Sequence, residues 1–170
     1  MSTSRRTFIK TSTLVLAGTA ILRKPVFASV PNKGIVGVQL YSIRDDMSKD
    51  PLGSLKQLAN MGYVYLEHAN YINRKFYGYT ASEFKKVLDS LDLKMISGHT
   101  VMGKQHWDEA KKDFTDEWKF TVDDAALLQQ KYVISPWMDV SMSTTYDDLK
   151  RCLEIFNMCG DLCKKSGMKF

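Results

Sequence analysis

The chain has 170 residues, with 24 lysines and arginines against 19 aspartates and glutamates, and a formal net charge of +5 at pH 7. Five of the basic residues and none of the acidic ones lie within residues 1–28, so the excess charge and the pI of about 9.0 belong to that segment. Residues 29–170 carry equal numbers of the two signs, which excludes a nucleic-acid-binding surface based on a general excess of basic residues.

The N-terminal segment has the pattern of a twin-arginine export signal. Residues 4–10 read SRRTFIK and precede an uncharged, mostly apolar run over residues 11–22, and a small residue, Ala28, follows at a position that a signal peptidase reads. The run is too short for a comfortable membrane span. We therefore expect export by the twin-arginine translocase, cleavage after Ala28 and a mature domain of residues 29–170 in the periplasm. An uncleaved N-terminal anchor is the alternative.

The first strand is expected over residues 35–43. Its apolar run has no strict alternation, which is typical of a parallel strand that is covered on both faces. The segment turns polar at its carboxyl end, with Gln39, Tyr41, Ser42 and Arg44 around the exit. Ligands of α/β proteins bind at the carboxyl ends of parallel strands, so this segment indicates both a fold class and the location of a site.

The segments after this strand continue to alternate between helix and strand patterns. In chain order we expect a helix over 50–61 that ends at Gly62, a strand over 63–67 and an aromatic loop over 70–79. A helix from the capping box Thr80–Glu83 to Leu91, a strand over 93–99, a helix over 116–130 and a strand over 132–137 should follow. The last helix should run from 144 to Gly167, with Tyr146, Leu149, Leu153 and Phe156 inward, and a fifth strand should begin at 168–170.

This alternation predicts an α/β fold with a parallel sheet and right-handed crossovers. Two architectures compete: an open flavodoxin-like or Rossmann-like sheet, and a (β/α)8 TIM barrel, which needs roughly 250 residues. A nucleotide-binding fold usually places a glycine-rich turn after the first strand, whereas residues 41–51 contain no glycine. Large polar or aromatic residues at all four strand ends favour a barrel, of which the chain would contain four βα units and the start of strand five.

Three cysteines, Cys152, Cys159 and Cys163, fall on one face of the last expected helix. Neighbours on one helix face are poorly placed to form a disulfide, and histidine partners at a zinc-finger spacing are missing from the sequence. We interpret the cysteines as small buried hydrophobic residues. Their odd number leaves a free thiol as an alternative.

Three segments resemble the xylose-isomerase-like sugar phosphate isomerase/epimerase family of TIM barrels. They are GVQLYSIRD at residues 37–45, LxxLAxMGYxYxE at 55–67 and SGH at 97–99, and the resemblance extends over residues 35–170. It implies a metal-assisted isomerase or epimerase that acts on a sugar or polyol derivative. A divalent metal (Mn, Mg or Zn) would hold substrate oxygens, and a carboxylate would move a proton between neighbouring carbons.

The same resemblance places the metal ligands at the ends of strands five to eight, beyond Phe170. No ligand can therefore be assigned in this sequence, and we expect the chain alone to be inactive. The resemblance also implies that Glu67, at the end of the second strand, and His99, at the end of the third, are catalytic. A solvated rim position for Glu67 and a structural core position for His99 are the alternatives.

Three further side chains at strand exits are candidates for binding a small-molecule sugar. Tyr41 and Arg44 would bind hydroxyl or acid groups, and Trp137 would stack on a sugar face or pack at the rim. Of the other histidines, His68 is expected to point away from the site, and His106 to lie on the surface or in a lid. The aromatic loop over residues 70–79 suits a lid over a carbohydrate site and equally a hydrophobic plug between helices.

Two interpretations without enzymatic activity stay open. The chain could be a compact flavodoxin-like binding module, which should be a soluble monomer, or the inactive product of an interrupted gene. A half barrel would instead leave open strand edges and an uncovered apolar face, so self-association through these edges is expected of it.

Overall fold

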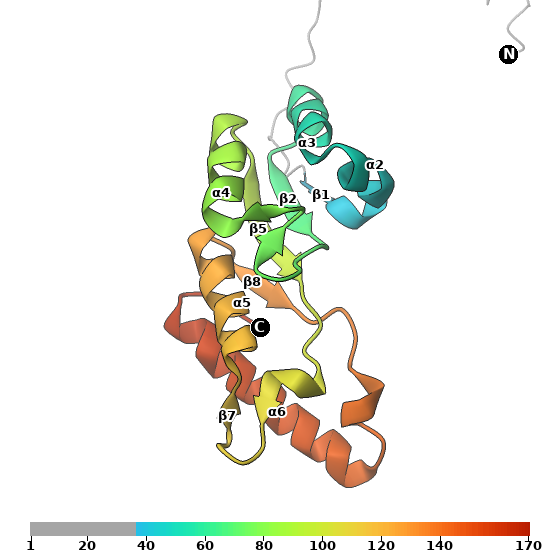
Figure 1. Ribbon diagram of the computed structural model, residues 1–170, viewed down its shortest axis with the longest axis vertical. Helices are drawn as coiled ribbons and strands as arrows, with labels where there is room; N and C mark the ends of the chain where they lie inside the picture. Colours follow the sequence, from blue (N-terminus) through green and yellow to red (C-terminus); the bar gives the residue numbers. More distant parts are fainter. Residues whose placement is uncertain (1–36) are drawn as a thin grey trace, which may run out of the picture. The chain divides into compact units, whose positions relative to one another are not determined.

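The computed structural model describes residues 37–170 (Figure 1). The predicted export signal, the mature N-terminus and residues 35–36 of the predicted first strand lie outside these residues. Four parallel strands form one sheet in the order β1-β2-β5-β8. They are β1 (Gly37–Gln39), β2 (Tyr65–His68), β5 (Lys94–His99) and β8 (Tyr132–Ile134). The predicted α/β fold with a parallel sheet is confirmed.

The strand order separates the two predicted architectures. The four strands follow one another across the sheet in chain order, as in the wall of a barrel, whereas an open doubly wound sheet reverses its order at a switch point. Residues 168–170 begin a further parallel strand beside β8: Lys169 N–H donates to the carbonyl of Lys131 at 2.9 Å, and Val133 N–H to the carbonyl of Lys169 at 2.9 Å. The strand order is therefore that of a TIM-barrel wall, and the start of a fifth strand continues it.

Within residues 37–170, five α-helices and three short 3-10 turns connect and flank the strands. They are η1 (Leu40–Ile43), α2 (Arg44–Lys49), α3 (Pro51–Asn60), α4 (Ala81–Ser90), η2 (Lys104–His106), α5 (Asp116–Leu127), η3 (Val140–Met142) and α6 (Tyr146–Lys165). The four predicted helices correspond to α3, α4, α5 and α6. No helix within residues 37–170 combines the length and the apolar character needed to cross a bilayer.

Local signals explain most of the helix boundaries. Asp50 caps α3 by accepting from Gly53 N–H at 2.9 Å, and Gly62, in a left-handed conformation with φ 89°, follows its end. The predicted capping box of α4 is present, with Thr80 and Glu83 each accepting from the backbone N–H of the other. α5 ends at Leu127, earlier than predicted, because Gln129 adopts a left-handed conformation.

Strand β1 is shorter than predicted. It ends at Gln39, and the chain turns through η1 into α2, where an extended strand to residue 43 was expected. The turn buries Leu40 and Met47 completely in the same hydrophobic cluster as Leu55 of α3. Burial of apolar surface is the main driving force of packing, and here it favours the helical turn.

The buried face of α6 coincides only in part with the predicted one: Phe156 packs against the core as predicted, but other positions do not. Tyr146 and Leu153 were expected to point inward, but they are 75% and 49% exposed. The buried stripe is instead formed by Cys152, Ile155, Cys159 and Cys163. Small cysteine side chains allow a helix to approach its neighbours closely, and all three are free thiols. Their interpretation as buried hydrophobic residues is confirmed.

The two faces of the sheet have different side chains. Leu66 and Met95 are buried in one hydrophobic cluster with residues of α3 and α4, and Val133 is buried in a second cluster with residues of α5 and α6. On the opposite face, Tyr65 is only partly buried and Tyr132 is exposed. Parallel sheets are usually covered on both faces. Within residues 37–170 the hydrophobic clusters cover only the face that carries Leu66, Met95 and Val133.

An extra residue in β5 controls which side chains reach this second face. Leu66 pairs with Met95 but Glu67 pairs with Ser97, so Ile96 is a one-residue bulge. Successive strand residues point to opposite faces. The bulge therefore lets Met95 join the core beside Leu66, while Ser97 still lies on the same face as Glu67.

Two antiparallel hairpins that the sequence patterns did not predict lie in the connections between strands and helices. The first pairs β3 (Lys75–Phe76) with β4 (Tyr79–Thr80), and the second pairs β6 (Trp107–Asp108) with β7 (Asp113–Phe114). Phe76 is buried and stacks on Phe84 of α4, with ring centroids 5.7 Å apart. Of the two alternatives predicted for the aromatic loop, a lid and a hydrophobic plug, the position of Phe76 agrees with the plug.

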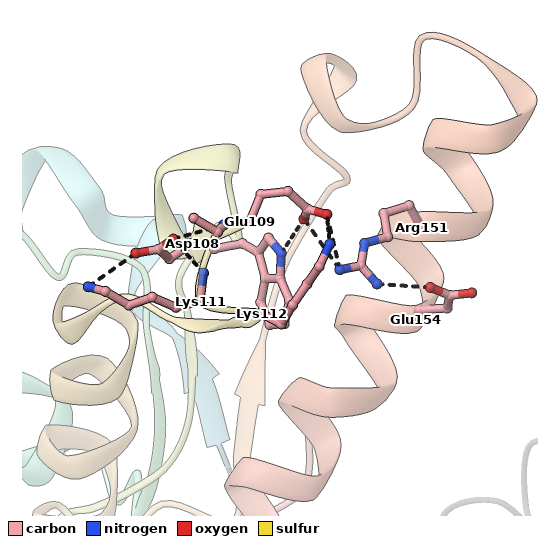
Figure 2. Close-up of polar contacts among 8 residues, drawn as sticks. Asp108, Glu109, Lys111, Lys112, Arg151 and Glu154 are labelled. Carbon is pink, nitrogen blue, oxygen red and sulfur yellow. Dashed lines mark hydrogen bonds and ion pairs between the residues drawn. The ribbon is translucent and has the colours of Figure 1, made fainter.

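Exposed ion pairs join the second hairpin to α6 (Figure 2). Glu109 accepts from Trp107 Nε1 at 2.6 Å and from Arg151 Nη2 at 3.3 Å, and it also pairs with Lys112. Arg151 reaches Glu154 on its own helix at 3.0 Å. Exposed pairs of this kind contribute little stability each, so their main effect is to orient the hairpin against α6.

Candidate functional site

A polar cluster lies at the carboxyl ends of three neighbouring strands. Gln39 ends β1, Glu67 lies near the end of β2, and Ser97 and His99 lie near the end of β5. Gln39 is paired with Glu67, and Glu67 with Ser97, so their side chains share one face of the sheet. The structure thus brings together the two predicted catalytic residues, Glu67 and His99.

The carboxylate of Glu67 is at the centre of this cluster. Ser97 Oγ donates to its Oε2 at 2.5 Å, Gln39 Nε2 donates to its Oε1 at 2.5 Å, and His99 Nε2 lies 3.0 Å from the same Oε1. His99 Nε2 also lies 3.2 Å from Gln39 Nε2, an amide donor, so the tautomer of His99 decides whether this ring nitrogen accepts from Gln39 or donates toward Glu67. Gln39 and Ser97 are functional candidates that the sequence interpretation did not select.

His68 lies on the opposite face of β2, as expected. It is buried, its ring contacts Phe76 edge-on with centroids 4.8 Å apart, and burial lowers its pKa to about 3, with a smaller contribution from His99. The ring also covers Gly98 in β5, where a Cβ atom would lie 1.7 Å from His68 Nε2. His68 is therefore a neutral structural residue, and Gly98 is required beside it.

A pocket of about 590 Å³ opens beside His99 at the carboxyl ends of the strands. Two predicted substrate-binding residues line it, Tyr41 from η1 and Trp137 from the exit of β8, and they are 55% and 64% exposed. Residues 69–74, which precede the first hairpin, residues from the segment 100–106 after β5, and residues of α5 form most of the remaining walls. The pocket thus joins His99, Tyr41 and Trp137 in one space.

Arg44 does not line this pocket. It begins α2, where its guanidinium donates to the backbone carbonyl of Tyr41 at 3.2 Å and lies 4.8 Å above the Tyr41 ring. The difference from the prediction follows from the helical turn after Gln39, because a strand ending at residue 43 would have placed Arg44 at its exit. Arg44 therefore reaches the pocket through its contacts with Tyr41.

A buried carboxylate fixes the wall of the pocket that residues 69–74 form, just before the first hairpin. Arg74 binds Asp124 of α5 with two hydrogen bonds, from Nε at 3.1 Å and from Nη2 at 2.9 Å, and its guanidinium lies 4.0 Å from the centre of the Phe120 ring. Tyr71 donates to Asp124 at 2.6 Å, and burial together with this bond raises the pKa of Tyr71 above its usual value. Asn73 and Arg74 both have left-handed backbones, with φ of 50° and 61°, so this contact maintains an uncommon loop conformation.

His106 is buried, which corrects the prediction that it lies on the surface or in a lid. Its Nδ1 accepts from Gly103 N–H at 2.9 Å, and its ring lies 5.1 Å from that of Trp118. Burial lowers its pKa, although Glu117, 3.6 Å away, opposes this shift. The 3-10 turn η2 folds the histidine inward, and this turn has no clear signal in the sequence.

The described residues do not fit a complete site for a divalent metal. Within residues 37–170, no group of three or more histidine, cysteine, aspartate or glutamate side chains is arranged to hold an ion. Glu67 and His99 supply two donor groups, but they bond to one another. Metal sites in proteins need more protein ligands or bound water around such a pair.

Comparisons with known proteins agree with the fold. No protein-family model and no curated protein matches the chain. Among solved structures, the chain is similar to a protein from Parabacteroides distasonis described as a sugar phosphate isomerase/epimerase, with 27% identity and a TM-score of 0.67 over 82% of this chain and 51% of that one. A second protein from the same organism and with the same description has 31% identity and a TM-score of 0.64, over 78% of this chain and 51% of that one.

A third solved structure, an AP endonuclease of family 2 from Brucella melitensis, has 15% identity and a TM-score of 0.50, over 69% of this chain and 46% of that one. It is a likeness of fold alone. The two more similar proteins support the resemblance to sugar phosphate isomerases/epimerases with a TIM-barrel fold. The chain spans about half the length of the solved structures that it matches.

Proposed function

We propose that the chain supplies one side of the active site of a sugar isomerase or epimerase with a TIM-barrel fold. The observation that carries the proposal is the bonded group of Gln39, Glu67 and His99 at the carboxyl ends of three adjacent strands. Active sites of TIM barrels lie at this end. The identity of 27% and 31% to the two Parabacteroides proteins supports the same activity.

The proposed chemistry is proton transfer at a carbon next to a carbonyl group. Glu67 accepts the proton, because its carboxylate lies partly exposed and two donors, Gln39 and Ser97, hold it in a fixed orientation beside His99. His99 and Gln39 both contact Oε1 of Glu67. When a substrate hydroxyl takes the place of one of these side chains at Oε1, that side chain can turn to another substrate oxygen. This would orient the sugar without moving the backbone.

We propose that a divalent metal (Mn, Mg or Zn) completes the site, with its ligands provided by strands other than the four described here. The metal would stabilise negative charge on substrate oxygens. Residues 37–170 contain an incomplete ligand set, so the chain without further strands should bind a sugar weakly and not convert it. The substrate is a small sugar or sugar derivative.

The uncovered face of the sheet supports the need for further strands. Tyr65, Tyr132 and Ile134 lie on this face, and Tyr132 is 46% exposed. The edges at β1 and at residues 168–170 have backbone groups that can pair with another strand. We propose that the sheet associates through these edges, with further strands of the barrel or with a second copy of the chain.

We also propose export to the periplasm through the twin-arginine translocase. The support is the pattern SRRTFIK at residues 4–10 and the apolar run after it. Residues 1–28 fused to a folded reporter protein should direct it to the periplasm. A pair of Arg5→Lys and Arg6→Lys substitutions should retain the reporter in the cytoplasm, and export of this variant would contradict the proposal.

The activity can be tested by complementation. The chain is mixed with the C-terminal half of the 31% identical Parabacteroides protein, and solvent deuterium uptake into aldoses and ketoses is followed by NMR with Mn²⁺, Mg²⁺ or Zn²⁺ present. We expect uptake in the mixture and none with either half alone. Glu67→Gln should lower the rate by a factor of about 10² to 10⁴, the usual contribution of a general base. Glu154→Gln, an exposed carboxylate on α6, is the matched control.

Turnover by the chain alone with one bound metal ion would refute the proposed incomplete site. Full activity of the Glu67→Gln mixture would refute the role of Glu67, and the absence of uptake from a mixture that forms a folded complex would refute the enzymatic proposal.

A further inference from the structure

The pocket beside His99 has little positive charge to offer an anion. Arg74 is the one arginine or lysine among the described residues that line it, and its Nε and Nη2 are already bonded to the buried carboxylate of Asp124. A guanidinium that is paired with a carboxylate is largely neutralised. Arg74 therefore provides a wall of the pocket and not a strong phosphate ligand.

Negative groups surround the same space. Glu117 lines the pocket, with a side chain that is 68% exposed, and Glu67 is bonded to His99, which lines it as well. The first turn of α5 carries Asp116 and Glu117, so this helix N-terminus, which would otherwise attract an anion, is already complemented. Burial lowers the pKa of His106 and keeps it neutral near pH 7.

Neutral polar groups and aromatic rings supply the other contacts in the pocket. Asn70, Asn73 and Gln105 provide amide donors and acceptors, and the exposed rings of Tyr41 and Trp137 provide flat surfaces. Such a pocket complements a ligand with many hydroxyl groups and an apolar ring face. Its volume of about 590 Å³ is in the range of small-molecule sites.

We infer that this pocket binds an unphosphorylated sugar or polyol and discriminates against a sugar phosphate. The inference rests on the proposed function, of which it specifies the substrate class. With Arg74 already paired to Asp124, the exposed carboxylate of Glu117 is the free charge of the lining and rejects a phosphate group, because like charges at short distance repel one another. The aromatic rings and side-chain amides of the pocket select the uncharged sugar ring of the ligand.

Ligand binding to the full chain tests this inference. Saturation-transfer NMR at low ionic strength compares D-glucose and D-xylose with D-glucose 6-phosphate. We expect the neutral sugars to bind at least about tenfold more tightly than the phosphate ester, which corresponds to about 1.4 kcal/mol. Trp137→Ala should remove most of the signal from the neutral sugars. Tyr146→Ala, at an exposed aromatic residue on α6 outside the pocket, should leave it unchanged.

A charge reversal tests the electrostatic part of the argument. Glu117→Lys replaces an exposed carboxylate and should improve the binding of D-glucose 6-phosphate several-fold while changing that of D-glucose little. Tighter binding of D-glucose 6-phosphate than of D-glucose to the wild-type chain would overturn the inference and leave the proposed function standing. If neither ligand binds the folded chain, both the inference and the proposed function are overturned.

Discussion

Replacing Gly98 by alanine should destabilise the protein at the point where the core meets the candidate site. A Cβ atom at Gly98 would lie 1.7 Å from Nε2 of His68, 2.1 Å from its Cδ2 and 2.4 Å from its Cε1. These distances are far below van der Waals contact, so either the imidazole or the backbone of β5 must move. His68 is buried, and Phe76 lies against its ring, which limits the movement of the imidazole.

The expected loss of stability is at the upper end of what overpacking causes. Inserting a methyl group into a well-packed core costs typically 1–3 kcal/mol, and three ring atoms are contacted at once here. We expect Gly98→Ala to lower the free energy of unfolding by about 3 kcal/mol. A shift of β5 would also displace His99 from Glu67, because His99 follows Gly98 directly.

Urea unfolding followed by circular dichroism measures the effect. Gly160→Ala is the matched control: its Cβ has no neighbour within 4 Å, and the position lies inside α6, so alanine there should stabilise the protein by up to about 1 kcal/mol. His68→Ala removes the ring that causes the clash. The double variant should therefore be about 2 kcal/mol more stable than the sum of the single effects predicts.

Two results would refute this reasoning. If Gly98→Ala unfolds within about 0.5 kcal/mol of the wild type, the two strands can separate at no cost. If the effects of Gly98→Ala and His68→Ala add, the clash does not involve the imidazole, and another contact must explain any loss.

Three further predictions follow from buried groups. Asp124→Asn should lower the free energy of unfolding by about 1–3 kcal/mol, because Arg74 loses its charged partner but is itself half exposed; urea unfolding that is unchanged would contradict this contact. The pKa of His68 is lowered from 6.5 to about 3, so the unfolded state binds more protons between these values, and stability should fall by about 1.4 kcal/mol per unit as pH drops below 6.5; His68→Ala should flatten this dependence. Burial raises the pKa of Cys163 to about 11 and that of Cys159 further, so iodoacetamide should label both by mass spectrometry only in denaturant, and rapid labelling of the native chain would show that they are accessible.

The order of strands and helices could be predicted because its signals are local. The capping box at Thr80 and Glu83 and the glycine at Gly62 mark helix ends within a few residues of sequence. The meeting of Glu67 and His99 was also predictable, because consecutive parallel strands bring their carboxyl ends together. Their catalytic roles remain predictions.

Features that depend on distant contacts could not be predicted. Arg74 and Asp124 lie 50 residues apart, and neither has a local pattern that points to the other. The burial of His106 depends on Trp118 of α5, although its sequence neighbours are those of a surface loop. The predicted inward position of Tyr146 was wrong because two apolar stripes lie side by side on α6. Only packing against the sheet selects the stripe that contains the cysteines.

The bulge at Ile96 divides β5 into two parts with separate tasks. Before it, Met95 belongs to the core, and substitutions there should change the stability of the protein but not its ligand binding. After it, Ser97 and His99 belong to the candidate site, and substitutions there should change ligand binding with less effect on the stability of the core. Loss of the single residue Ile96 would join the two parts into one regular strand. Either Met95 would then leave the core or His99 would turn away from Glu67, so the length of this strand is as important to the protein as its composition.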